Sequence, residues 1–346
     1  MSTQEDSGVP FEMCNGQQHL RLLELPSALL EQITSKRLSN LTLKSATPNS
    51  SSQTSANAVL CTDNQTYRVR QVQSSNSIYV LQPSETSPED GFIPTIGLSA
   101  IAQCTATLEL IPEPASATPF LKQTVPVYSG PESGTQLPTA SAPLEKKNKH
   151  AILERAPCSL GEFNKACEEL CVFEVDGQAW LPTASMLANV WKSIISGATM
   201  RSVNLGEGFS IATLSRIVEE DGHPTALFRA VMDRLSSNDI ELMDDYAALS
   251  REKAVPWVGL VLLQSHHMST EAVLLSDFLQ DWQNQLLEDW RNNAKLDALK
   301  GKYSQPGNGR IVFDESGGSA SASSTPAKSG RNNTRKWHEK FKNARR

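Results

Sequence analysis

Three cysteines near the middle of the chain have a spacing that raises the question of a metal site. Cys158, Cys167 and Cys171 form a C-x8-C-x3-C pattern. Tetrahedral zinc usually takes closely paired ligands and a fourth group. Cys167 and Cys171 instead lie one helical turn apart on an apolar stripe with Leu170, where cysteine is commonly buried. We interpret them as buried thiols and expect neither a metal nor a cofactor.

Other residues that could do chemistry have equally plain interpretations. The histidine pair at 266–267 has no acid at ligand spacing, and the acid pairs at 219–220 and 244–245 fall at helix ends or in polar turns, where solvated charge is usual. The chain has no G-x-x-x-x-G-K-[ST], G-x-G-x-x-G, H-E-x-x-H or G-x-S-x-G pattern. We predict that the protein is not an enzyme, with a hydrolase of unrecognised site as one alternative.

The basic end of the chain suggests an anionic partner. Its last sixteen residues, RNNTRKWHEKFKNARR, hold seven Lys or Arg against one acid, a net charge of +6, whereas the whole chain carries -6. Trp337 and Phe341 are spaced i and i+4, so they would anchor one helix face and leave the cations outside. The simpler alternative is that the basic end serves only solubility or nuclear import. The KKNK run at 146–149 is a second candidate for the import signal. The predicted DNA-binding residues are Lys300, Lys302, Arg310, Arg335, Lys336, Lys340, Lys342, Arg345 and Arg346.

Length and composition favour several small domains in a soluble protein. The 346 residues are 39% hydrophobic and 20% charged, and the length suits two or three domains. The start, MSTQEDSGVPF, lacks the features of a secretory signal, and no apolar run is long enough to span a bilayer. We expect an intracellular protein with reduced thiols and no membrane partner.

Residues 1–112 have a β-rich pattern. The stretch 57–82, NAVLCTDNQTYRVRQVQSSNSIYVLQ, divides into three strand-like pieces separated by the turns DNQ and QSSN. The alternation of its faces slips at Gln71 and Val72, where a bulge would fit. A second strand-rich segment covers 92–111. A β unit of this size must cover its edges or pair them with another chain.

The composition then changes twice. Repeated Pro, Ser, Thr, Ala and Gly over 113–150 predict a flexible linker. After it, the capping box of Ser159 and Glu162 opens a helix, and a hairpin and another helix follow, an order typical of a winged helix. The fold class predicted is α+β, an N-terminal β-barrel-like domain followed by tandem winged-helix domains. Three winged-helix-like units are predicted over 151–222, 223–267 and 268–346.

Several segments resemble the sister chromatid cohesion Dcc family, a subunit of the cohesion-type alternative replication factor C clamp loader. They are LRLLELPSALLEQI, LTLKS, AVLCTDNQTYRVRQVQSSNSIYVL and RKWHEKFK. The similarity is most specific at VLCT, TY and SSNS, where Cys61, Tyr67 and Asn76 stand at positions like those of the family.

The resemblance implies a non-catalytic nuclear subunit that acts in sister chromatid cohesion and in loading the sliding clamp at replication forks. Residues 1–112 would co-fold with the large and small cohesion-specific subunits of the loader. The winged-helix units would meet single- or double-stranded DNA and the catalytic subunit of DNA polymerase epsilon, and the sliding clamp would be contacted indirectly. The alternative from the helices alone is a sequence-specific transcription regulator. The residues expected at the partner interface are Val59, Leu60, Tyr67, Val69, Ile78 and Val80.

Overall fold

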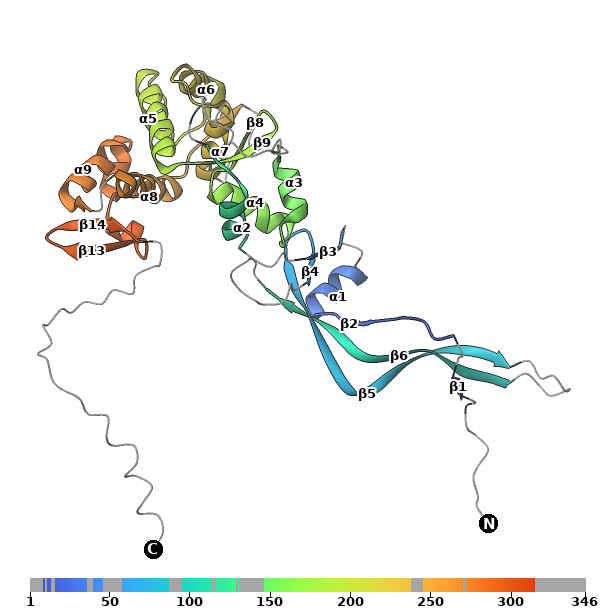
Figure 1. Ribbon diagram of the computed structural model, residues 1–346. Coiled ribbons are helices and arrows are strands. Elements are labelled where there is room, and N and C mark those ends of the chain that lie inside the picture. Colours follow the sequence, from blue (N-terminus) through green and yellow to red (C-terminus); the bar gives the residue numbers. More distant parts are fainter. Residues whose placement is uncertain are drawn as a thin grey trace, which may run out of the picture.

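The structure is a computed structural model that consists of a curled β-sheet and an arm of helices. It describes residues 9, 11–13, 16–35, 40–45, 58–86, 95–113, 116–128, 130, 146–237, 245–269 and 272–314. The sheet and most of the arm lie at opposite ends of an elongated chain (Figure 1). They meet where the turn between strands β4 (Ala58–Cys61) and β5 (Thr66–Thr86) approaches helix α4 (Leu160–Glu169). No helix among these residues is long and apolar enough to cross a bilayer.

The sheet is an open half-barrel of six strands with one short helix. Its helix is α1 (Ser27–Thr34). Its strands are β1 (Phe11–Met13), β2 (Leu22–Glu24), β3 (Thr42–Ser45), β4 (Ala58–Cys61), β5 (Thr66–Thr86) and β6 (Thr95–Pro112). The strand order is β1-β6-β5-β4-β3, and β2 also pairs with β6. The barrel-like prediction is therefore confirmed as a curled sheet, although the barrel is not closed within the described chain.

The longest element is an antiparallel ribbon of β5 and β6, which extends away from the helical arm (Figure 1). The predicted DNQ turn separates β4 from β5, but the predicted QSSN turn does not exist. The strand β5 continues through it, and its register against β6 shifts between Gln73 and Ile78 and again between Val80 and Leu81. The predicted bulge at Gln71 and Val72 thus lies a few residues too early. Polar residues that suit a turn also suit a bulge, because both leave the regular ladder of hydrogen bonds.

The helical arm repeats one order of elements three times: a helix, a short strand, two or three more helices, and one or two closing strands. In the first block these are α2 (Thr118–Thr124), β7 (Val127–Tyr128), α3 (Lys149–Arg155), α4 (Leu160–Glu169), β8 (Phe173–Val175) and β9 (Gln178–Pro182). In the second block they are α5 (Ala184–Met200), β10 (Phe209–Ser210), α6 (Ile211–Glu220), α7 (Thr225–Leu235) and β11 (Tyr246–Ala247). In the third block they are α8 (Arg251–Ser269), β12 (Val273–Leu274), α9 (Leu275–Asn284), the 3-10 helices η2 (Glu288–Asn293) and η3 (Leu296–Leu299), β13 (Tyr303–Gly307) and β14 (Arg310–Phe313).

The strand that follows the first helix of each block pairs with a closing strand of the same block. The small sheets have the orders β7-β9-β8, β10-β11 and β12-β14-β13. Each block therefore closes on itself through a long-range strand pair.

The block boundaries differ from those predicted. The predicted boundary at 222/223 lies between α6 and α7, inside the second block, and the one at 267/268 divides α8. Gly222 and Pro224 are turn signals, but the turn that they mark lies within a block. Only the strand pairs show where one block ends.

Part of the predicted linker is folded. Within 113–150, Ala117, Leu121 and Val125 are buried in a core that also contains Ile152 and Phe163. The linker prediction is wrong for α2 and β7, since a few apolar residues on one face are enough to dock a short helix onto an existing core. Residues 131–145 lie outside the described chain.

A larger core runs through the second and third blocks. Trp282 of α9 is completely buried, and its indole N–H donates to the Val255 carbonyl of α8 at 3.0 Å. Trp191 of α5 donates to the Gln285 carbonyl at 2.8 Å. Trp290 is buried as well. All three tryptophans therefore belong to this core.

Candidate protein-interaction surface

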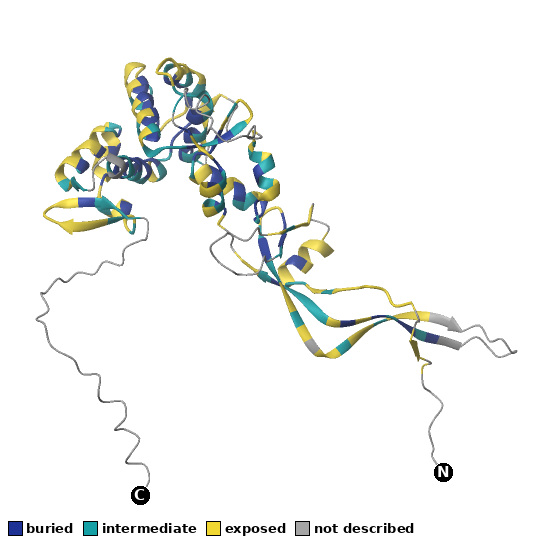
Figure 2. Cartoon of the chain, viewed as in Figure 1, coloured by how far each residue is buried: buried dark blue, intermediate teal, exposed yellow. Residues whose placement is uncertain are grey.

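Apolar side chains are exposed mainly on the β-sheet region. Leu43 is 67% exposed, Phe11 56% and Ile78 48%. The large apolar residues exposed in this region are Val9, Phe11, Met13, Leu20, Leu23, Leu30, Ile33, Leu41, Leu43, Ile78, Tyr79 and Leu81. The described part of the helical arm is longer, yet its exposed large apolar residues are only Val127, Leu160, Met200, Tyr246 and Leu274. In Figure 2 the strands beside the ribbon are mostly exposed (yellow), and along the ribbon exposed residues alternate with intermediate and buried ones.

The sheet has too small a core to cover these residues. Its buried cluster comprises Leu29, Leu60, Tyr67 and Leu110, with Leu25 and Val69 packed at the margin. Scattered apolar residues on a surface are normal, but a concentration of them on one region is typical of a surface that another protein covers.

The strand β5 also has an open edge. On one side it pairs with β6 along nearly its whole length, whereas on the other side β4 pairs only with residues 66–68. From Val69 to Thr86 this second side has no partner strand among the described residues. We call residues 69–86 the open β5 edge. Backbone N–H and C=O groups directed outward along such an edge can pair with a strand from another chain.

The outer side of β6 is partly covered, in contrast to β5. Residues Phe11–Met13 of β1 pair with Leu98–Ala100, and Leu22–Glu24 of β2 pair with Thr107–Glu109. Between them, the Gln18 N–H donates to the Ile101 carbonyl at 2.7 Å. The N-terminal segment therefore shields the β6 side, and within the described part of the chain the open edge of the ribbon is the β5 side.

The six predicted interface residues divide between core and surface. Val59, Leu60 and Tyr67 are at most 9% exposed, so they stabilise the chain's own sheet and are not open to a partner as predicted. Val69 and Val80 are half-buried, and Ile78 is exposed.

Sequence reasoning missed other exposed apolar residues. Among them are Phe11, Leu43, Tyr79 and Leu81. The run of four consecutive apolar residues at 78–81 was the available signal, because a strand that is apolar on both faces needs a cover on both faces.

The predicted DNA-binding residues within the described chain are exposed but dispersed. Lys300, Lys302 and Arg310 all face solvent in the third block. Lys302 lies at the base of the β13–β14 hairpin, where its carbonyl accepts from the Asp314 N–H at 3.0 Å, and Arg310 lies next to the turn at the other end. The structure therefore does not bring these two cations together. The other six, Arg335, Lys336, Lys340, Lys342, Arg345 and Arg346, lie outside the described residues.

The cysteines considered above are buried free thiols. Cys158, Cys167 and Cys171 are each at most 7% exposed. Burial raises the pKa of Cys158 to about 12 and that of Cys167 to about 11. Thiols with such pKa values are poor nucleophiles and poor metal ligands near neutral pH. Cys171 follows the end of α4 in a left-handed conformation, so it does not continue the helical stripe as the sequence suggested.

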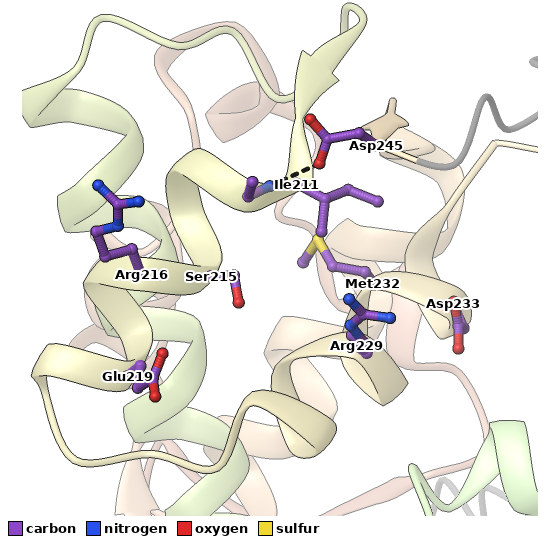
Figure 3. Close-up of a pocket in the computed structure, with 9 residues that line it drawn as sticks. Ile211, Ser215, Arg216, Glu219, Arg229, Met232, Asp233 and Asp245 are labelled. Atoms are coloured by element: carbon purple, nitrogen blue, oxygen red, sulfur yellow. Dashed lines mark hydrogen bonds between the residues drawn. The ribbon is translucent and has the colours of Figure 1, made fainter.

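A cavity of about 430 Å³ lies between α6 and α7. It is lined by apolar atoms of Ile211 and Met232 and by charged side chains of both signs, including Arg229 and Asp233 (Figure 3). Asp245 at its rim is already engaged, because its carboxylate accepts from the Ser210 hydroxyl at 2.9 Å and from the Ala212 N–H at 3.2 Å. The lining contains neither histidine nor cysteine.

The curled sheet and the three helical blocks define an α+β protein, and its described part has exposed apolar side chains beside an open strand edge. The family model of the sister chromatid cohesion protein Dcc1 matches residues 20–313, and the chain belongs to this family. The resemblance noted in the N-terminal segments is thereby confirmed. The family is a non-catalytic one with a role in sister chromatid cohesion. No individual curated protein is similar enough in sequence to add to this match.

Proposed function

We propose that this protein is a non-catalytic nuclear subunit of a cohesion-type alternative replication factor C clamp loader, and that its β-sheet assembles with the large and small cohesion-specific subunits. Family membership supports the link to cohesion. The observation that carries the proposal is the open β5 edge with exposed apolar side chains beside it. A strand from a partner would satisfy the backbone groups of the edge, and partner side chains would cover the apolar residues.

We further propose that the helical arm is a tandem of winged helices that contacts DNA and the catalytic subunit of DNA polymerase epsilon. The support is the element order. The third block is the clearest case, because a helix, a strand, further helices and a hairpin follow one another, and the first strand pairs with the last. This is the order of a winged-helix domain. In this proposal the chain would help to place the sliding clamp without touching it.

The test is recovery of the complex from cells that co-express the full chain with the loader subunits. In the double variant I78K/L81K, two exposed apolar residues of the open β5 edge become charged. Because both side chains face solvent, the fold should persist, whereas a partner would have to bury two unpaired ammonium groups. We expect recovery of the loader subunits to fall at least about tenfold.

The matched control is Met200→Lys. Met200 is 76% exposed but lies on α5 in the helical arm, so this variant should recover the subunits as the unmodified chain does. Undiminished recovery by the double variant, or a full chain that ignores the loader subunits, would refute the assembly proposal.

A further inference from the structure

The β-sheet and the helical arm are joined through the N-terminus of α4. The turn between β4 and β5 approaches this helix end, and the Asp63 carbonyl accepts from the Gly161 N–H at 2.8 Å. The hydroxyl of Thr66, the first residue of β5, accepts from the Ser159 N–H at 2.8 Å and donates to the Glu162 carboxylate in a short hydrogen bond. Three hydrogen bonds therefore connect elements about a hundred residues apart in sequence.

These contacts share in the cap of the helix. Ser159 and Glu162 already form a capping box, in which the Ser159 hydroxyl accepts from the Glu162 N–H and the Glu162 carboxylate accepts from the Ser159 N–H. The first N–H groups of a helix have no partner within the helix. In α4 the capping box satisfies the Glu162 N–H and the Asp63 carbonyl satisfies the Gly161 N–H, while the Ser159 N–H is shared by Glu162 and Thr66, so the sheet completes the cap.

A second connection comes from β3. The ammonium group of Lys44 donates to the carbonyls of Leu153 and Cys158, each at 2.9 Å. The Leu153 carbonyl is near the end of α3, where backbone carbonyls attract a cation. Lys44 thus ties the sheet to the segment between α3 and α4 at a point separate from Thr66.

The two surfaces fit closely. Thr66 and Ser159 are each 1% exposed. A Cβ atom added to Gly161 would lie 2.8 Å from Asn64 Oδ1 and 3.3 Å from the Asp63 carbonyl oxygen, so a larger residue here would displace the Asn64 side chain and crowd the turn. Buried hydrogen bonds with a charged member are costly to break, because each partner left behind is unsatisfied.

We propose that this contact, formed by Lys44, Asp63 and Thr66 with Ser159, Gly161 and Glu162, is a rigid joint that fixes the helical arm at one angle to the β-sheet. The chain then holds two binding partners at a fixed distance and orientation. One partner covers the open β5 edge, and the other binds the helical arm. The proposed function supplies only the identity of those two partners, and the joint itself stands on contacts within the chain.

The test compares Thr66→Val with the unmodified full chain by hydrogen exchange and small-angle X-ray scattering. Valine keeps the shape of threonine but removes both hydrogen bonds that the hydroxyl makes to α4, together with its contact to Cys61 inside the sheet. We expect exchange of the amides at 159–162 to become at least about tenfold faster. We also expect the distribution of interatomic distances derived from the scattering to become broader, because the arm would then adopt several angles to the sheet. Lys44→Met, which keeps the aliphatic stem, should loosen the joint in the same way and carries the test if the threonine variant does not fold.

The matched control is Thr183→Val. Thr183 caps α5 by accepting from the Met186 N–H, but this contact lies wholly within the arm. Its loss should speed exchange only at the start of α5 and leave the scattering unchanged. Unaltered scattering and unaltered exchange at 159–162 in the Thr66 and Lys44 variants would overturn the joint. Because no loader subunit is needed, a chain that fails to bind those subunits but loosens in these variants would refute the proposed function and keep the joint.

Discussion

The absence of a side chain at Gly259 allows two helices of the third block to pack closely. Gly259 of α8 lies against the indole of Trp282, and a Cβ atom at this position would be 2.5 Å from Trp282 Cε2. The indole N–H is fixed by the Val255 carbonyl one turn earlier on the same helix. The ring therefore cannot withdraw without losing a buried hydrogen bond, and α9 is held against α8 at this point.

We predict that Gly259→Ala lowers the free energy of unfolding by about 1–3 kcal/mol, because the added methyl group must displace a rigid buried ring. At a solvent-exposed helix position the same change would raise the free energy of unfolding by about 1 kcal/mol. The sign of the measured change therefore distinguishes close packing from open space at this position. Thermal or chemical denaturation of the full chain measures the effect. The control is Gly206→Ala, whose Cβ would make an ordinary contact of 3.4 Å with Trp290. A Gly259 variant at least as stable as the unmodified chain would show that this packing is wrong.

Local signals could be read from the sequence, and contacts between distant residues could not. The capping box of Ser159 and Glu162 was predicted from a spacing of three residues and is present. The part of Thr66 in the same cap depends on a strand 93 residues earlier, which no local pattern encodes. The need for glycine at 259 likewise arises only from a ring on another helix.

Among the elements, α2 shows how composition misleads. It lies in a segment rich in Pro, Ser and Thr, yet Leu121 is completely buried against the core of the first block. Low average hydrophobicity does not prevent folding when the few apolar residues share one face and a core is already present. The strand β5 shows the opposite error, in which polar residues predicted a turn. These residues lie within one continuous strand and cause only a shift in its register against β6.

We predict that Leu121→Ala destabilises the first block by about 2–5 kcal/mol through the cavity that it leaves. Hydrogen exchange should show lost protection in α2, α3 and α4 before other helices. Gln123→Ala, a change at an exposed position of the same helix, should have little effect. If both variants behave alike, α2 is not part of the core.

At the scale of the whole molecule, charge is separated along the chain. The last sixteen residues carry a net charge of +6 and the remaining residues -12. The α+β class with its barrel-like sheet and the family followed from the sequence, because strand patterns and motif segments are local. The block boundaries and the open edge did not, since both are defined by which strands pair across long separations.

We predict that the full chain binds DNA with little sequence preference and that its affinity falls roughly a thousandfold between about 50 and 200 mM salt, as about six phosphate contacts require. Fluorescence anisotropy at several salt concentrations measures this slope. The triple variant K300A/K302A/R310A and a chain shortened before Arg331 should each flatten it. The double variant K192A/R201A removes exposed cations of the second block as a control. A flat response in the unmodified chain would eliminate phosphate contacts.

The open β5 edge also limits the amount of this protein that can accumulate in a cell without its partners. Copies synthesised in excess of their binding partners would display a long template on which identical ribbons can pair with one another. The amount of this protein would then have to match the amount of its partners. This match requires either synthesis together with the partners or rapid degradation of copies without a partner. In a pulse-labelling experiment, the protein expressed alone should accordingly be degraded faster than the protein expressed together with its partners.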